Sequence, residues 1–366
     1  MTQPKNSGPL YGLKIIEFEG IGPAPLAGQL LCDLGADVIK IKKKPNNQKI
    51  EPILDRKKNV INLDLKNNKD KVLVKKLISK ADVLIEGFRP GVMERLGLGP
   101  TDCEKINLKL IYGRITGWGQ NGPYAKKAGH DINYLSITGA LNAIGSKETP
   151  PIPPLNLLGD YAGGTMFLIM GILSALWERN NSKKGQVVDA AMIEGVPALM
   201  SLIHTFISEK NWNNTRSSNL LDGGCPYYRC YETKDGLFVS VGALENKFFA
   251  VLIEKLELNQ TWIKDQENKS KWDQLTKAFS EKFLTKTRKE WESIFIETDA
   301  CVEPVLNFTE VEGNLQNQAR KIFYRENNIL QANIAPKFSR SIPHDHSNKA
   351  SSTKTISQIL KNWNID

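Results

Sequence analysis

A histidine and an aspartate, each set beside glycines, are the residues of this chain best suited to chemistry. The first lies in Gly129-His130-Asp131-Ile132-Asn133-Tyr134, and the second lies further along in Leu158-Gly159-Asp160-Tyr161. An imidazole and a carboxyl group are much used to move protons near neutral pH, and glycine lets a ligand approach the backbone. Two such groups that face one carbon from opposite sides could remove and return its proton, and so racemise it.

An apolar run with helical spacing follows Asp160, from Tyr161 to Trp177, and predicts a buried core helix. The run is short for a membrane span, which we do not expect. Asp160 would lie at or near the N-terminus of this helix, where its side chain could simply cap the helix. Alternatively, free backbone N–H groups there could hold an oxygen that gains charge during a reaction, while Gly159 and Gly163 leave room for a ligand.

The N-terminal half alternates strand-like and helix-like segments. Strands are predicted at 13–18, 36–41, 60–63, 82–85 and 110–113, and helices at 27–34 and 70–79. A further strand, or the entry from a strand into a helix, is predicted near 187–192. Such alternation is typical of a parallel sheet, so we predict an α/β fold for this half.

The first predicted strand-to-helix turn and the lysines after the second strand bear on nucleotide binding. The turn holds Gly20-Ile21-Gly22, but Pro25 replaces the third glycine of a dinucleotide fingerprint. The second strand ends in lysines, at 40–44, where an NAD site needs an acid. These lysines and Arg56-Lys57-Lys58 suit phosphates instead, which indicates NADP or coenzyme A.

The second half of the chain predicts a smaller α+β domain. Its polar start is predicted to be a linker, and Asp235-Gly236 between two β-rich runs predicts a hairpin, followed by helices to about residue 300. We predict a large domain over 1–200, a linker over 201–224, a small domain over 225–310, and over 311–366 a returning linker and C-terminal segment that packs on the large domain.

Composition limits the partners and the compartment. The chain has 366 residues, a net charge of +9 and five cysteines. Much of the charge is a diffuse Lys and Asn content, typical of a solvated surface, and we expect no nucleic-acid partner. An odd number of scattered cysteines argues against a disulfide framework, and the first residues lack the apolar core of a signal peptide. We therefore expect a cytoplasmic protein.

The other histidines are weaker candidates for a site. His204 lies in an apolar, helix-like stretch and is predicted to be a core or interface residue. His344-Asp345-His346 lies in a Ser- and Lys-rich segment without partner ligands, which indicates a solvated loop rather than a metal site. No metal site is predicted.

Five segments carry a resemblance to a known family. They are 34–40, 86–93, 129–134, 159–160 and 299–305. Because of these segments the chain resembles the family III coenzyme A transferases from Leu13 to about Ser339. Segment 129–134 resembles the corresponding segment in the branch of the family that racemises 2-methylacyl-CoA thioesters. The resemblance implies a ring-shaped chain with a Rossmann-like large domain and a smaller α+β domain, which forms an interlocked homodimer. Substrate would lie between the large domain of one subunit and the small domain of the other.

The same resemblance implies roles for individual residues. His130 and Asp160 match two acid/base residues, and Glu245 matches a carboxylate that orients the histidine. Asn156 and Tyr228 match residues that line the reacting centre. Coenzyme A contacts match Lys40, Leu63, Asp64, Leu65, Lys66, Gly87, Phe88, Arg89, Arg95, Gly129, Asp131, Ile132, Asn133 and Tyr134. Coenzyme A would enter as part of the acyl-CoA substrate, and no separate cofactor is implied.

These groups suit proton exchange at the carbon next to a thioester carbonyl. Loss of that proton moves charge onto the oxygen, which requires a base and a partner for the oxygen. Neutral His130 would take the proton from one enantiomer while protonated Asp160 supplies one to the opposite face, and the backbone N–H of Asp160 could serve the oxygen. Asp160 then needs a raised pKa, to which an apolar setting with Met166 and Phe167 could contribute.

Two other functions remain open on the sequence. In a coenzyme A transferase of the same fold, Asp160 would be a nucleophile that forms a mixed anhydride and then an enzyme thioester. His130 and Glu245 have no part in that scheme. A catalytically silent coenzyme A-binding protein would keep Lys40, Arg89 and Arg95 but could lose His130. The presence of His130, Asp160 and Glu245 together favours the racemase.

Overall fold

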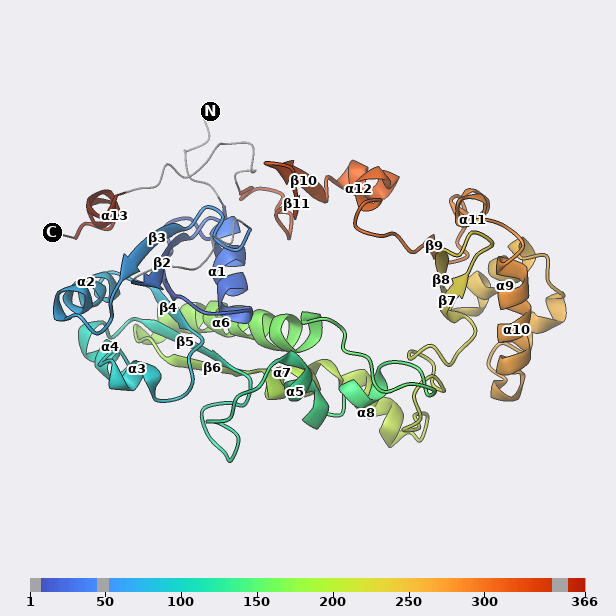
Figure 1. Ribbon diagram of the computed structural model, residues 1–366, viewed down its shortest axis with the longest axis horizontal. Helices are drawn as coiled ribbons and strands as arrows, with labels where there is room; N and C mark the ends of the chain where they lie inside the picture. Colours follow the sequence, from blue (N-terminus) through green and yellow to red (C-terminus); the bar gives the residue numbers. More distant parts are fainter. Residues whose placement is uncertain (1–7, 45–52, 344–354, 366) are drawn as a thin grey trace. The chain divides into compact units, whose positions relative to one another are not determined.

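The computed structural model describes residues 8–44, 53–343 and 355–365, which form two compact units (Figure 1). The first unit comprises 1–138, 154–199 and 321–366, and the second comprises 139–153 and 200–320. The predicted large domain therefore loses 139–153 to the second unit. The chain leaves the first unit twice and returns to it each time.

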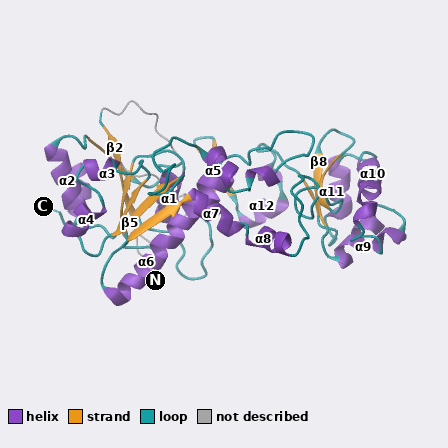
Figure 2. Cartoon of the chain, turned by 90° about the horizontal axis from the view of Figure 1, so that it is seen from below, coloured by secondary structure: helices purple, strands orange, loops and turns teal. Residues whose placement is uncertain are grey.

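A six-stranded sheet forms the centre of the first unit (Figure 2). Its strands are β1 (Lys14–Phe18), β2 (Asp37–Lys43), β3 (Asn59–Leu63), β4 (Val83–Glu86), β5 (Ile111–Thr116) and β6 (Val187–Ala191). They lie in the order β3-β2-β1-β4-β5-β6, and every neighbouring pair is parallel. This is the strand order of a Rossmann fold, and the predicted α/β class is confirmed. The order reverses between β1 and β4.

Helices cover both faces of this sheet. The helical elements of the first unit are α1 (Pro23–Asp33), α2 (Asn68–Ile78), α3 (Val92–Arg95), α4 (Pro100–Ile106), α5 (Asp131–Ile137), η2 (Leu157–Met166), α6 (Phe167–Ser182), α7 (Met192–Leu199) and α13 (Ile356–Asn362). Buried side chains of α1 and α6 form one core cluster with the sheet, and those of α2, α4 and α13 form another.

The alternation of side chains along the strands explains the two core clusters. Successive residues of a strand point to opposite faces of the sheet. Ile15 accordingly packs in the cluster with α1 and α6, whereas Ile16 packs in the cluster with α2 and α4. Both isoleucines are fully buried. Strands that are buried on both faces and rich in β-branched residues are typical of a parallel sheet.

The segment that carries Asp160 is a π-helix, which the sequence did not predict. This helix, η2, begins at Leu157, after Asn156, and continues into α6. Asp160 therefore lies in the first turn and is not the residue that precedes the helix. π-Helices are rare and occur often at functional sites.

The glycines of η2 face protein atoms. A Cβ atom on Gly163 would lie 2.7 Å from Val196 Cγ2 in α7, and a Cβ atom on Gly159 would lie 2.6 Å from Asp131 Oδ2. These glycines let α5 and α7 approach the π-helix closely. The prediction that Gly159 and Gly163 leave room for a ligand is therefore wrong.

One helix in the described part of the chain is long and apolar enough to cross a membrane. This helix consists of η2 and α6 and spans the 26 residues Leu157–Ser182. Its most apolar stretch of 18 residues has a mean hydropathy of 1.4, and 33% of that stretch is buried. Leu168 and Ile172 of α6 are fully buried against the sheet. Core helices of globular proteins pass the same test of length and composition, so the test alone is weak evidence for a span.

The second unit has a three-stranded antiparallel sheet packed against helices. Its strands are β7 (Tyr228–Glu232), β8 (Phe238–Gly242) and β9 (Val302–Pro304). Its helical elements are η1 (Leu141–Ala143), α8 (Ser201–Ser208), α9 (Asn246–Lys255), η3 (Gln260–Ile263), η4 (Lys269–Lys271), α10 (Trp272–Phe283), α11 (Arg288–Phe295), η5 (Val311–Gly313) and α12 (Leu315–Arg320). The hairpin predicted at Asp235-Gly236 joins β7 to β8.

The second unit has an aromatic core of its own. Phe279, Phe283 and Trp291 are fully buried in one cluster with β7 and β8. The predicted linker over 201–224 is partly wrong, because it contains α8. His204 lies in α8 and is exposed, so it is not a core residue, and the alternative that it lies in an interface stays a prediction.

Residues from 321 onward return to the first unit. They form a hairpin of β10 (Phe323–Glu326) and β11 (Ile329–Ala332), and α13. Ile359 and Trp363 are buried in the cluster that α2 forms with the sheet. Trp363 Nε1 also donates a hydrogen bond of 2.8 Å to Asp37 Oδ2 in β2. The end of the chain is thus part of the core of the first unit.

Candidate active site

A cavity of about 1110 Å³ opens at the carboxyl edge of the six-stranded sheet. Residues at or just after the ends of all six strands line it: Phe18, Lys43, Leu63, Gly87, Thr116 and Met192. It includes the point between β1 and β4 where the strand order reverses. Open α/β sheets bind their ligands at this point, so the cavity is the candidate site.

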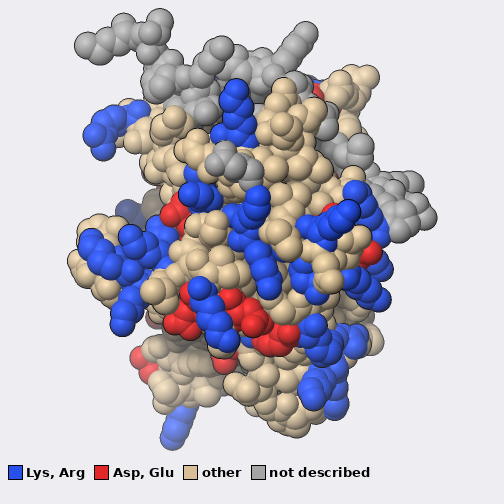
Figure 3. Space-filling model, turned by 90° about the vertical axis from the view of Figure 1, so that its left-hand side faces the viewer, with Lys and Arg blue, Asp and Glu red and all other residues tan. Residues whose placement is uncertain are grey.

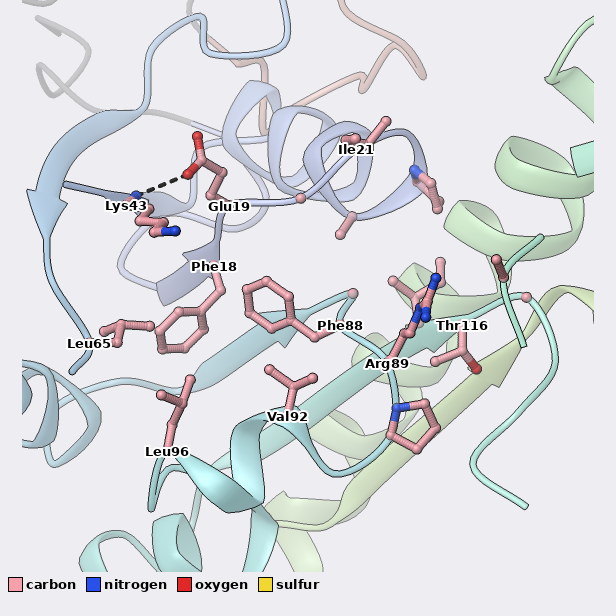
Figure 4. A pocket seen from close by; sticks show the side chains of 18 of the residues that line it. Phe18, Glu19, Ile21, Lys43, Leu65, Phe88, Arg89, Val92, Leu96 and Thr116 are labelled. Atoms are coloured by element: carbon pink, nitrogen blue, oxygen red, sulfur yellow. Dashed lines mark hydrogen bonds between the residues drawn. The ribbon is translucent and has the colours of Figure 1, made fainter. Parts of the chain in front are cut away.

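One part of the cavity is an apolar pocket around two phenylalanines (Figure 4). The rings of Phe18 and Phe88 lie with centroids 6.4 Å apart and planes tilted by 58°. Leu65, Val92 and Leu96 surround them. This part of the cavity suits a flat or apolar group of a ligand.

A buried ion pair supports the loop that carries Phe88. Glu86, at the end of β4, accepts the backbone N–H of Phe88 at 2.8 Å through Oε2. Its Oε1 accepts a hydrogen bond of 2.8 Å from Arg114 Nε in β5. Both side chains are almost fully buried. The pair therefore fixes the course of the chain after β4, where the next residues, Gly87 and Arg89, also line the cavity.

Six cations that are exposed or half-buried line the cavity. They are Lys43, Lys66, Lys71, Arg89, Arg95 and Lys127. The acidic residues in the lining are Glu19, Asp64 and Asp160. The backbone N–H of Lys43 donates to Glu19 Oε2 at 2.9 Å, which ties the end of β2 to the turn after β1 (Figure 4). An excess of cations suits a ligand that carries several phosphates.

Lys40, predicted to contact coenzyme A, does not line this cavity. Its side chain is 1% exposed, and its ammonium lies 2.6 Å from Asp55 Oδ1 and 3.6 Å from Glu17 Oε1. Lys42, two residues on and therefore on the same face of β2, also pairs with Asp55, at 2.7 Å. Lys43 is the exposed lysine of this run at the cavity. The structure therefore corrects the prediction from Lys40 to Lys43.

Figure 3 shows how charge is distributed on one side of the protein. Lys and Arg side chains form separate groups on this face, with Asp and Glu side chains gathered among them. The visible cations do not form one continuous stripe on it. Such mixing is typical of a solvated surface.

His130 lines the cavity from the residue before α5. Its side chain is exposed, and its backbone N–H donates to Asn133 Oδ1 at 3.1 Å, which fixes the start of the helix. Gly129 is required beside it, because a Cβ atom there would lie 2.7 Å from the ring of Tyr134. The hydroxyl of Tyr134 donates to the Gly129 carbonyl. The turn that presents His130 is thus held by its own helix.

Asp160 lines the same cavity as His130. Burial raises the pKa of its carboxyl group, and the negative charge of Asp131 raises it further. A hydrogen bond with Asn156 and the charge of His130 act in the opposite direction on this pKa. A carboxyl group with a raised pKa keeps its proton to higher pH, as a general acid requires.

The backbone N–H of Asp160 has a protein partner. It donates to Asp131 Oδ2 at 2.7 Å. The predicted use of this N–H for a substrate oxygen is therefore wrong in this structure. On its other side, the carboxyl group faces the turn before α1, where a Cβ atom on Gly22 would lie 3.0 Å from Asp160 Oδ2.

The chain matches the family described as CoA-transferase family III over residues 10–344. The chain belongs to this family. It is 41% identical to the alpha-methylacyl-CoA racemase of Mus musculus over 333 residues. The matched region is 91% of this chain and 87% of the mouse protein. The chain is 41% identical over 314 residues to the protein of the same name from Homo sapiens, with 86% and 82% covered. A CAIB/BAIF family protein from Brucella suis shares the fold, with a TM-score of 0.79 and 23% identity over 98% of this chain and 100% of that one.

Most of the predicted coenzyme A contacts of this family III protein line the cavity. They are Leu63, Asp64, Leu65, Lys66, Gly87, Phe88, Arg89, Arg95, Gly129 and Tyr134. Asp131, Ile132 and Asn133 do not line it. Asp131 supports the backbone of Asp160, Asn133 caps α5, and Ile132 is exposed. Asn156 contacts the carboxyl group of Asp160, as a residue of the reacting centre would.

Two predicted site residues of the family III protein belong to the second unit. Tyr228 begins β7, and Glu245 is the residue before α9. Both side chains are exposed. Their predicted roles beside His130 stay predictions.

Sequence reasoning missed part of the cavity lining. The missed residues include Glu19, Ile21, Lys71, Val92, Leu96, Ile115, Thr116, Trp118 and Lys127. Several of them lie at or just after the ends of β1 and β5, where the rule for carboxyl ends of parallel strands could have found them. Among the described residues, no group of three or more His, Cys, Asp or Glu could hold a metal. His344-Asp345-His346 lies outside these residues.

Proposed function

We propose that the protein racemises 2-methylacyl-CoA thioesters at the carbon next to the carbonyl, by removal and return of a proton through an enolate. One observation carries the proposal: an imidazole and a carboxyl group with a raised pKa, on His130 and Asp160, line one cation-rich cavity. The 41% identity to two proteins named alpha-methylacyl-CoA racemase supports it.

The two side chains take complementary roles in this reaction. Neutral His130 removes the proton from one enantiomer, and protonated Asp160 delivers a proton to the opposite face of the enolate. In the reverse direction ionised Asp160 is the base and protonated His130 is the acid. Each turnover therefore needs one proton shared between the pair. The raised pKa of Asp160 favours such sharing, because it brings a carboxyl group closer to the range in which imidazole titrates.

The rest of the cavity binds the coenzyme A part of the substrate. Exposed cations such as Lys43 and Arg89 hold the phosphates. The pocket around Phe18 and Phe88 takes an apolar or flat part of the molecule. We propose no separate cofactor, because proton removal and return change no oxidation state, and we propose that the protein acts in the cytoplasm.

We further propose that two chains form an interlocked homodimer. In it, Glu245 of the partner subunit orients the imidazole of His130 and selects its tautomer. The partner subunit's Tyr228 lines the reacting centre. The exposure of both side chains in the second unit leaves them free for such contacts.

A coenzyme A transferase is the second candidate, because the family is described by that activity. In it the ionised carboxylate of Asp160 would attack the thioester carbon and expel the coenzyme A thiolate. The raised pKa of Asp160 disfavours the ionised nucleophile. His130 also has no role in this scheme. Both points favour the racemase.

The test is incubation of one enantiomer of a 2-methylacyl-CoA in deuterated water. Racemisation places deuterium on the α-carbon and lowers the optical purity together. Transfer moves coenzyme A to an added free acid without label on the α-carbon, and that result would overturn the proposal. His130→Ala serves as the control for the protein preparation, because loss of a general base costs about 100- to 10,000-fold in rate.

A further inference from the structure

We propose that Asp131 is a positioning residue that holds Asp160 in place against the substrate. This inference rests on the proposed function. Asp131 was predicted to contact coenzyme A, but its side chain is 6% exposed and does not line the cavity. Its carboxylate is turned toward the π-helix instead, where it accepts the backbone N–H of Asp160.

The start of a π-helix needs an acceptor of this kind. Backbone N–H groups in the first turn of a helix have no partner within the helix, and the i to i+5 bonding of a π-helix adds one more such group. Asp160 is the fourth residue of η2 and carries one of these N–H groups. Asp131 Oδ2 accepts it at 2.7 Å. A charged acceptor makes this a strong hydrogen bond.

Gly159 allows the contact. A Cβ atom on Gly159 would lie 2.6 Å from Asp131 Oδ2 and 2.9 Å from Asp131 Cγ. Any larger residue at 159 would push the carboxylate away from the Asp160 N–H. The absence of a side chain at Gly159, next to Asp160, thus makes room for the carboxylate of Asp131, next to His130.

The second carboxylate oxygen of Asp131 indicates that its negative charge has a function. Oδ1 is buried and has no hydrogen-bond partner among the described residues. Leaving a charged oxygen in this state is unfavourable for folding. An uncharged acceptor such as asparagine could have served the N–H alone. The negative charge therefore has a use beside Asp160.

That use is electrostatic. The groups that act on the Asp160 carboxyl are Asp131, Asn156 and His130, and Asp131 is the one whose charge favours the protonated form. Asp131 follows His130 directly in the chain. The first residue at the start of α5 therefore presents the imidazole, and the next residue anchors the backbone of Asp160, which carries the carboxyl group of the acid/base pair.

The experiment separates position from charge. Asp131→Asn keeps an acceptor oxygen but removes the charge, Asp131→Ala removes both, and Gly159→Ala keeps the charge but displaces it. We expect the kcat of D131A and G159A to fall about 100-fold, as a displacement of one ångström at a reacting centre can do, with little change in KM. D131N should keep most of its kcat.

The pH profile is the readout that a purely structural role would not move. Removal of the negative charge in D131N lowers the pKa of Asp160. The inactive form in which His130 and Asp160 are both protonated then appears only at lower pH, so the acid limb of kcat/KM moves to lower pH. Asp102→Asn, the same change in the first turn of α4, is the matched control and should leave the limb in place.

A measurement without turnover distinguishes this inference from the proposed function. The Asp160 carboxyl is titrated by ¹³C NMR of the aspartate-labelled protein, with the Asp160→Asn variant used to assign its signal. A lower pKa of Asp160 in D131N supports the inference even in a preparation that does not racemise. An unchanged titration, or unchanged kcat in both D131A and G159A, overturns it. Thermal unfolding of each variant shows whether it is folded.

Discussion

Lys58 Nζ donates a hydrogen bond of 2.6 Å to Glu17 Oε2, and both side chains are completely buried. Lys58 also donates to the Pro25 carbonyl at 2.9 Å, in the first turn of α1. Burial raises the pKa of Glu17 and lowers the pKa of Lys58. Glu17 therefore compensates the charge of Lys58 in the core, and Lys58 together with Lys40 compensates the charge of Glu17.

Removal of one partner should destabilise the first unit strongly. Lys58→Met leaves the Glu17 carboxylate with less compensation, and we expect a loss of about 3–5 kcal/mol in the free energy of unfolding. The double variant with Glu17→Gln should recover most of this loss. Urea denaturation measures both, with the exposed Lys105→Met as control. A single variant no less stable than the control would contradict the expectation.

Two lysines of β2 should behave differently. Lys43→Met should raise KM for the acyl-CoA by about three- to tenfold through loss of an exposed phosphate contact. With an acyl-pantetheine thioester, which lacks the nucleotide, the variant should match the wild type. Lys40→Met should instead lower the melting temperature, because Asp55 and Glu17 lose a buried partner.

The comparison of the two lysines can fail in a defined way. If K40M has an unchanged melting temperature and a raised KM, then Lys40, and not Lys43, contacts the phosphate. Steady-state kinetics with both thioesters and a thermal scan of each variant are sufficient.

The fold could be predicted from the sequence because its signals are local. Runs of β-branched residues such as those at Ile15 and Ile39 mark strands, and alternation with helices predicts a parallel sheet. The partner of Lys40 could not be predicted in this way. Asp55 lies beyond the end of β2 in the sequence, in a turn before β3, and nothing in the residue types joins the two.

The sequence predicted which residues form the candidate site better than it predicted how they contact one another. His130 and Asp160 share one cavity as expected. The π-helix was missed, because residue types do not distinguish i to i+5 bonding from an ordinary helix. The hydrogen bond from Asp160 to Asp131 spans 29 residues and depends on how α5 meets η2. Such a contact is a property of packing.

Asp160→Asn should separate proton exchange from inversion. The amide group of this variant cannot deliver or remove a proton, so racemisation should fall by at least about 100-fold. His130 remains exposed and can still exchange the α-proton of the enantiomer it faces. In deuterated water that enantiomer should gain label and keep its configuration. Label gained equally by both enantiomers would contradict a two-base mechanism.

The same variant should also be more stable than the wild type near neutral pH. The pKa of Asp160 is raised in the folded protein, so ionisation favours the unfolded chain once the pH exceeds its unfolded value of about 3.9. This stability penalty grows as the pH rises from the unfolded pKa to the folded pKa, levels off above the folded pKa, and is absent below the unfolded pKa. Melting curves at several pH values should show D160N gaining stability on the wild type between acid and neutral conditions. A constant difference would contradict the raised pKa.

Co-expression of two inactive chains tests the interlocked homodimer. One chain carries His130→Ala and the other carries Glu245→Gln. If each site combines His130 of one chain with Glu245 of the partner subunit, every mixed dimer has one intact site and one doubly altered site. Random pairing then restores about a quarter of the wild-type activity. No restoration, despite isolation of mixed dimers with two different tags, would place both residues of a site on one chain.

Trp363 and Ile359 lie in the same hydrophobic cluster as the first strands of the chain. During synthesis, the cluster around the first strands is therefore completed only after the second unit and α13 have left the ribosome. A premature stop codon far downstream of His130 and Asp160 would accordingly destabilise the first unit by removing Ile359 and Trp363 from this cluster, although every cavity residue had been translated. The length of this delay makes the emerging sheet a place where chaperone binding is expected.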